Sequence, residues 1–226
     1  MSRQKVPTGD PEPDGYDYSP MNTSAQSSET TSSGAENDVR QRIIAAAFDV
    51  LQSLGPTRLR VQEVAKRAGV STTLLYYYFD GKNDLIAAAY AADYESILEA
   101  DLALLRKMFA EPVQPPDVLA SMVDAYQVSF EDTDTRRRRL DALAASQHDP
   151  TVASAIAPMQ RAFTTELRSM VENLQSRGWL AGVGDVNAFM MAVMALPLGL
   201  VFRDLDPSFA VDMTSYMMTV LPSPPG

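Results

Sequence analysis

The sequence predicts an all-α protein, with a small N-terminal bundle of three helices followed by a larger C-terminal helical domain. Three observations lead to this expectation. From Asp38 onward, apolar residues recur every three to four positions. Almost no segment alternates with a period of two, as strands would. Gly and Pro residues interrupt the pattern at intervals that suit helices.

The N-terminal bundle has clear stop and start signals. Gly55-Pro56 ends the first helix, and Gly69 ends the second because glycine tolerates positive φ. Ser71 caps the third helix, which Asp80-Gly81 closes. We expect helices over about 38–54, 61–68 and 72–79. The apolar stripe of the first contains Ile43, Ala47, Val50, Leu51 and Leu54.

The C-terminal domain begins with a long helix from about Asn83 to Phe109, which ends before the Pro-rich stretch 112–116. Its other helices should also carry apolar faces. The one around 185–203 is apolar nearly all round and should be buried on several sides. We expect these further helices over about 117–131, 135–147, 151–177, 185–203 and 208–220.

Composition divides the chain into four parts. Residues 1–36 are rich in Ser, Thr, Pro, Gly and Asp, so we expect a disordered tail. This tail is either an inert extension or an acidic mask for a basic surface. The remaining parts are a helical bundle at 37–83, a larger domain at 84–221 and a disordered tail at 222–226.

Charge is distributed unevenly along the chain. The net charge is −10, yet residues 37–85 hold seven basic and five acidic side chains. Any contact with the phosphates of nucleic acid is therefore expected in that segment.

Several classes of protein are excluded or disfavoured. No apolar run approaches the roughly 18 residues of a membrane span, and the polar, acidic N-terminus is unlike a secretory signal peptide. We expect a cytoplasmic protein. Without cysteine and with one histidine, neither a disulfide nor a zinc centre is expected, and no cofactor is implied. An α-helical enzyme is disfavoured because no nucleophile–base pair, metal-ligand spacing or phosphate loop is visible.

The segment 64–79 carries the functional signal. Two short helices joined through one glycine, with the second capped by serine, predict a helix-turn-helix. Leu75 and Phe79 should face the bundle core, whereas Thr73 and Tyr77 share an outer side. The N-terminal residues of such a second helix meet base edges in the major groove.

Phosphate contacts are expected around this outer side. Tyr76 and Tyr78 offer hydroxyl donors, and Lys82 lies at the start of the long helix. The alternative is that the three consecutive tyrosines form a packed helix end.

The stretch from Arg40 to Tyr90 resembles the DNA-binding domain of the TetR family of repressors. The resemblance rests on Val64-Ala65, on Ala68-Gly69-Val70-Ser71, on Leu75-Tyr76-Tyr77-Tyr78-Phe79, and on Lys82 and Leu85. It implies that Thr72, Thr73, Leu74 and Tyr77 face bases, that Tyr76, Tyr78 and Lys82 hold phosphates, and that Gln62 can reach the groove.

The sequence departs from the family pattern at the start of the second helix. The family usually has Ser or Thr there, as N-cap and phosphate ligand, but this chain has Arg58-Leu59-Arg60-Val61. Arg60 could replace the hydroxyl as a phosphate contact. Alternatively, it is a solvated side chain.

The C-terminal domain suggests a pocket for a small molecule. Many of the twelve methionines lie there, and Met side chains fill irregular space. Stripes that mix Met with aromatic residues point to an apolar or aromatic ligand, although methionine at helical spacing can equally be plain core. The predicted ligand-binding residues are Met122, Tyr126, Met159 and Phe163.

Four consecutive arginines, Arg136 to Arg139, cannot share one face of a helix. We expect local ion pairs with the acids nearby. The alternatives are an anionic ligand or an extra DNA contact. The candidate partners are Glu131, Asp132, Asp134 and Asp141.

Together with the resemblance, these features predict a DNA-binding homodimer that represses transcription from a palindromic operator until a small ligand releases it. The resemblance implies dimerisation through the helices at about 185–203 and 208–220. The alternative is a DNA-binding regulator without a small-molecule ligand, controlled by a protein partner.

Overall fold

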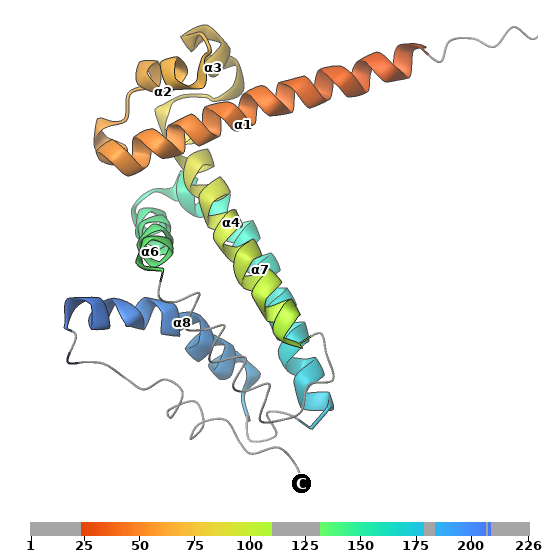
Figure 1. The fold of residues 1–226 in the computed structure, drawn as a ribbon, viewed down its shortest axis with the longest axis vertical. Helices are drawn as coiled ribbons and strands as arrows, with labels where there is room; N and C mark the ends of the chain where they lie inside the picture. Colours follow the sequence, from red (N-terminus) through yellow and green to blue (C-terminus); the bar gives the residue numbers. More distant parts are fainter. Residues whose placement is uncertain (1–23, 110–131, 179–183, 207, 209–226) are drawn as a thin grey trace, which may run out of the picture. The chain divides into compact units, whose positions relative to one another are not determined.

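The computed structural model describes residues 24–109, 132–178, 184–206 and 208, and all regular secondary structure in these ranges is helical (Figure 1). The predicted helix at 117–131 lies outside the described residues, as does nearly all of the one at 208–220. The helices are α1 (Ser24–Arg58), α2 (Val61–Ala68), α3 (Thr72–Tyr78), α4 (Lys82–Phe109), α6 (Thr133–His148), α7 (Pro150–Ser176) and α8 (Val186–Leu205).

Helix α1 differs from its prediction at the N-terminal end. It begins at Ser24 rather than near Asp38, so residues 24–36 are helical instead of forming part of the predicted disordered tail. No proline interrupts this stretch, and a polar helix can extend from a packed one even where residues 34–37 are exposed. Residues 1–39 form a unit separate from residues 40–226, and the packing below concerns the second unit.

The regular part of α1 ends where the sequence predicts. Gly55 has φ 75° and ψ 166°, a backbone conformation that favours glycine, and Pro56 follows in a short continuation. Leu54, expected in the buried stripe, is 45% exposed because it lies in the last turn before this break, at the edge of the bundle.

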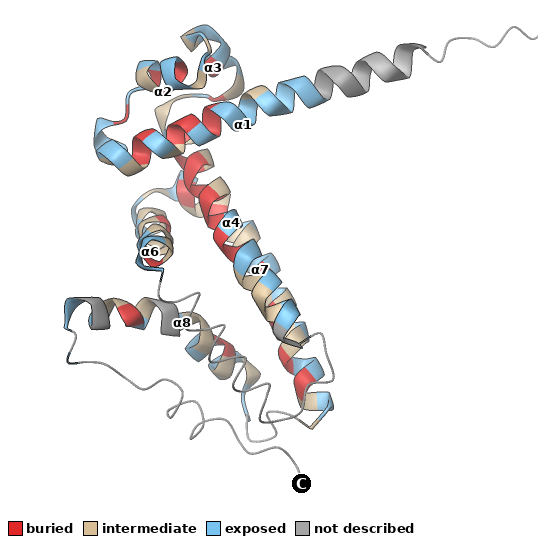
Figure 2. Ribbon diagram, viewed as in Figure 1, coloured by how far each residue is buried: buried red, intermediate tan, exposed pale blue. Residues whose placement is uncertain are grey.

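The three N-terminal helices share one apolar core, which Figure 2 shows in red. Leu75 and Phe79 bury the inner side of α3 and the residue after it, as predicted. Between α2 and α3, Gly69 has φ 67°, and the Oγ of Ser71 accepts a hydrogen bond from the Leu74 N–H at 3.1 Å. The other core residues include Ile43, Ala47, Val50 and Leu51 of α1 and Val61, Val64 and Ala65 of α2.

In the C-terminal domain, α4 packs against α6 and α7, and α8 contacts α6 and α7 (Figure 1). Helix α7 buries a stripe with spacings of three, four and seven residues. Asp132, Asp149 and Asp185 cap the N-termini of α6, α7 and α8. The buried stripe of α7 consists of Val152, Ile156, Phe163, Leu167, Val171 and Leu174.

Helix α8 contradicts the expectation of burial on several sides. Met190 and Leu200 are buried, but Met191 and Phe202 are 67% and 64% exposed. Within the described part of the chain, α8 thus has a buried side and an exposed apolar side. Among the described residues, no helix is long and apolar enough to cross a membrane.

We predict that Gly69→Ala destabilises the fold by about 1 kcal/mol, the cost of holding an L-residue in the left-handed region. An added Cβ at Gly69 would meet no atom within 4 Å, so the cost would come from the backbone alone. The measurement is urea unfolding followed by circular dichroism at one protein concentration. The control is Gly34→Ala, which also enters open space but at an ordinary helical φ. Equal stability of the Gly69 variant and wild type would contradict this role of Gly69.

Candidate nucleic-acid interface

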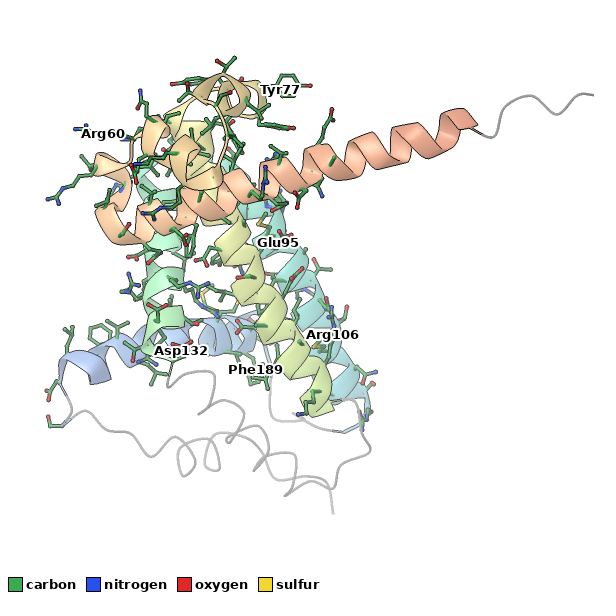
Figure 3. The ribbon with its side chains drawn as sticks, turned by 45° about the horizontal axis from the view of Figure 1, so that its top comes forward. Arg60, Tyr77, Glu95, Arg106, Asp132 and Phe189 are labelled. Atoms are coloured by element: carbon green, nitrogen blue, oxygen red, sulfur yellow. The ribbon has the colours of Figure 1, made fainter. Side chains whose placement is uncertain are left out.

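The helix-turn-helix presents one side of α3 to solvent. Leu75 is fully buried and Phe79 is 2% exposed, which fixes the rotation of α3 about its axis. Tyr77, on the other side, is 72% exposed and points away from the ribbon (Figure 3). A helix fixed in this way offers a constant set of side chains to a partner.

The residues predicted to face bases lie largely on this outer side. Thr73 and Leu74 are exposed, and Thr72 is half-buried. The Tyr77 ring packs edge-on against the Tyr78 ring, with centroids 5.1 Å apart and planes at 88°. Tyr78 therefore restricts the position of the Tyr77 ring.

The tyrosines do not form a packed helix end as a group. Tyr76 is 56% exposed and Tyr77 is 72% exposed. Only Tyr78 is half-buried. The packing alternative therefore applies to Tyr78 alone.

The start of α2 carries the departure from the family pattern that the sequence indicates. Arg60 occupies the N-cap position with an extended backbone, and its side chain makes no capping hydrogen bond. Arg60 and Gln62 are both exposed, and Figure 3 labels Arg60 beside the loop that leads into α2. The long cationic side chain is thus directed to solvent and not to its own helix.

Lys82 has a structural contact that the sequence did not indicate. Its Nζ donates a hydrogen bond to the main-chain carbonyl of Thr57 at 3.0 Å, which ties the start of α4 to the end of α1. An ammonium group has three protons, so this bond leaves donors for a phosphate.

Further cations surround α2 and α3. Arg58 and Lys66 are exposed, and the sequence indicates no role for them beyond their charge. Arg67 is 3.9 Å from Glu63, in an exposed pair of small energetic weight. Arg40, by contrast, lies over the Phe79 ring at 5.3 Å and supports the packing of the bundle.

Two of the four predicted ligand-binding residues lie in the described part of the chain. Met122 and Tyr126 lie outside the described residues. Met159 and Phe163 lie one turn apart on α7, where Phe163 is buried and Met159 is half-buried.

A polar network that the sequence did not reveal lies beside them on α7. The Tyr94 hydroxyl donates to Gln160 Oε1 at 2.5 Å, and Gln160 Nε2 contacts Thr164 Oγ1 at 3.3 Å and Met194 Sδ at 3.6 Å. Burial raises the pKa of Tyr94 above its usual value of 10.0, as does Asp101, so the hydroxyl stays a donor at neutral pH. The network joins α4, α7 and α8. No local pattern could indicate it, because Tyr94 and Gln160 are 66 positions apart.

The local pairing expected for the arginine run is correct for Arg137. Arg137 pairs with Asp134 at 2.6 Å and with Asp141 at 3.6 Å. Arg138 and Arg139 instead reach across to α4, and Asp132 accepts hydrogen bonds at the start of α6. The sequence prediction was wrong for these two arginines because charges within one helix compete with acids on a packed neighbour. Glu131 lies outside the described residues.

Comparisons with known proteins agree with this arrangement. Residues 43–89 match the family model described as "Bacterial regulatory proteins, tetR family". The chain is 32% identical over 119 residues to the HTH-type transcriptional regulator CymR of Pseudomonas putida, covering 53% of this chain and 56% of that relative. It is 28% identical over 179 residues to the HTH-type transcriptional regulator BetI of Stenotrophomonas maltophilia (strain R551-3), covering 69% of this chain and 88% of that one.

The fold of the chain is also similar to that of a solved structure. The chain superimposes on the solved structure of the multidrug binding protein EbrR, complexed with imidazole, with a TM-score of 0.54 and 20% identity. This likeness covers 83% of this chain and 92% of EbrR. The matched residues 43–89 contain the helix-turn-helix and the core that orients it, and both regulators resemble the chain beyond it. Residues 43–89 thus match the TetR family model, and over a longer stretch the chain is similar to HTH-type transcriptional regulators.

Proposed function

We propose that the chain is a homodimeric regulator of transcription that binds a palindromic DNA operator and is released from it by a small apolar or aromatic molecule. The observation that carries the DNA-binding part is the outer side of α3. Exposed hydroxyl and aromatic groups of Thr73, Tyr76 and Tyr77 stand there beside the exposed cations of α2.

The chemistry of that side suits double-stranded DNA. Threonine can bond several base edges, and the methyl groups of Thr73 and Leu74 can contact a thymine methyl. The phenol groups of Tyr76 and Tyr78, together with Arg60 and Lys82, supply donors for phosphates on either side. Gln62 lies on the neighbouring exposed part of α2.

A second copy of the chain is needed because a palindromic operator has two half-sites about 34 Å apart. Helix α8 offers a surface for that copy. Small side chains in this exposed stripe would let a second helix approach closely, and the large apolar ones would be withdrawn from water. The stripe follows helical spacing and consists of Ala188, Met191, Ala192, Ala195, Gly199 and Phe202.

Ligand control is supported by the chemistry of α7. Met159 and Phe163 supply apolar surface, and the adjacent Tyr94–Gln160 pair supplies a hydrogen-bonding group. EbrR, which has a similar fold, is named as a multidrug binding protein. For release to occur, the ligand must bind more tightly to the arrangement that does not fit the operator. An operator complex that no small molecule dissociates would favour control by a protein partner instead.

We predict that Tyr77→Ala weakens binding to the selected operator by about tenfold and leaves binding to unrelated DNA nearly unchanged. The reason is that Tyr77 is placed at base edges, where one good contact contributes about 1–3 kcal/mol. The operator is first obtained by genomic-fragment selection with the purified protein, and both affinities are then measured by fluorescence anisotropy. Enrichment of no inverted repeat by wild type would contradict the proposed function itself.

We predict that Lys82→Ala weakens binding to both kinds of DNA and lowers the slope of log K against log salt by about one, since one phosphate contact is lost. Arg161→Ala is the matched control, because it removes the same charge from an exposed site on α7. The same loss of slope in both variants would assign the effect to net charge rather than to a phosphate contact.

We predict that Phe202→Glu converts the dimer to a monomer, because a carboxylate would be buried in the α8 interface. Sedimentation equilibrium measures the molecular mass. Ser154→Glu adds the same charge to an exposed site on α7 and should leave the dimer intact. A Phe202→Glu protein that remains dimeric would place the dimer contact elsewhere.

A further inference from the structure

The arginine run on α6 has a role beyond the ion pairing expected from the sequence. Successive residues of a helix point about 100° apart, so the four side chains enter different surroundings. Arg136 is buried and donates to Thr133 Oγ1 at 3.2 Å, and Arg137 pairs within α6. Arg138 and Arg139 both bind acids of α4, and Arg138 also lies over a ring of the DNA-binding bundle.

Arg138 joins three helices with one side chain. Its Nε donates to Asp93 Oδ1 at 2.9 Å and to Oδ2 at 3.2 Å, and its Nη2 also contacts Asp93 Oδ1. The Asp93 side chain is 5% exposed and that of Arg138 is 24% exposed. The same guanidinium lies over the ring of Phe48 on α1, 5.4 Å from its centroid.

Helix α1 in turn supports the recognition helix. Phe48 lies next to Ala47, which is fully buried in the bundle core. Two turns earlier on α1, Arg40 lies over Phe79, the residue that ends α3. A continuous set of contacts therefore runs from α6 through Arg138 and α1 to the end of α3.

Arg139 provides a comparison within the same pair of helices. It binds Asp101 Oδ2 at 2.6 Å, and the two side chains are 12% and 24% exposed. This pair also links α6 to α4 through an arginine and an aspartate that are both largely buried. Asp101 lies eight positions after Asp93, about 12 Å farther along α4, and no ring of α1 is among the contacts described for Arg139.

We propose that Arg138 is a positioning residue that holds α1, and with it the recognition helix α3, in the arrangement that fits the operator. The inference rests on the proposed function. An Asp–Arg pair that merely stabilised the fold could be replaced by apolar residues of similar volume with little effect on DNA binding, because such replacements are often neutral or stabilising. A planar guanidinium that is held by two carboxylate oxygens while stacked on a ring fixes a geometry that apolar side chains do not reproduce.

The experiment compares two matched double variants, Asp93→Leu with Arg138→Met and Asp101→Leu with Arg139→Met. Each removes a whole ion pair between α4 and α6, so neither leaves an uncompensated buried charge. Operator affinity, affinity for unrelated DNA, dimer mass and melting temperature are measured for both and for wild type. We expect the Arg138 pair variant to bind the operator at least about fivefold more weakly, which is the lower end of typical coupling between sites. Its affinity for unrelated DNA should be unchanged, and the Arg139 pair variant should match wild type.

If the Arg138 pair variant does not fold, two single variants test whether Arg138 positions α1 and α3. Arg138→Lys keeps a charge beside Asp93 but cannot bind both carboxylate oxygens and stack on Phe48 at once. Phe48→Leu removes the ring and keeps the ion pair. Both should weaken operator binding while melting near the wild-type temperature.

The outcomes separate the inference from the function on which it rests. Operator affinity within twofold of wild type in the folded Arg138 pair variant, or in both single variants, would overturn the inference. Equal losses in the Arg138 and Arg139 pair variants would also overturn it, because the effect would then belong to any tie between α4 and α6. If wild type itself selects no operator, the proposed function fails instead.

Discussion

The burial of Leu75 and Phe79 is the constraint on which the interface depends. These two residues, four positions apart, attach α3 to the bundle and so determine which of its side chains meet solvent. If α3 rotated by one residue, Leu74 or Tyr76 would replace Leu75 in the core and the outer side would change completely. The Gly69 turn and the Ser71 cap set where α3 begins, so the rotation and the start of the helix are both fixed by local chemistry. Recognition by a short helix requires this fixity, because seven residues have too little backbone bonding to hold a position alone.

The distribution of charge along the chain indicates which part of it would attract DNA. The chain carries a net charge of −10, whereas residues 37–85 hold seven basic and five acidic side chains, so attraction to phosphates is expected in that segment. Exposed cations such as Arg58, Arg60 and Lys66 stand close in sequence to the outer side of α3. A basic patch on an acidic protein disfavours binding in other orientations, and this contributes to specificity at physiological salt as well as to affinity.

The sequence predicted best what is decided locally. The bounds of α2 and α3 agree with prediction to within a residue because Gly69 and Ser71 are strong signals over a few positions. The predicted start of α1 near Asp38 was wrong, because the polar extension that begins at Ser24 lacks the apolar periodicity on which the prediction relied. Met191 and Phe202 of α8 are exposed in the single chain, although burial was expected, because the composition of a helix does not reveal whether its own chain or a second one covers it. The bonds from Arg138 to Asp93 and from Tyr94 to Gln160 could not be predicted, because 45 and 66 positions separate the partners. Their contact depends on how α4 packs against α6 and α7.

Helix α4 connects these long-range contacts. Asp93, Tyr94 and Asp101 lie on it, and each binds a polar side chain of α6 or α7. A polar group of a ligand near Met159 and Phe163 could compete for the Tyr94–Gln160 bond, which lies one residue along α4 from the Asp93–Arg138 pair. Ligand binding and DNA binding would then depend on neighbouring residues of one rigid helix, and no long chain of intermediates would be needed. Linkage requires the effect to be mutual, so the operator would weaken ligand binding by the same factor by which the ligand weakens operator binding. Differential contacts at one helix are sufficient for such coupling, provided that the ligand and the operator favour different positions of α4 relative to α6.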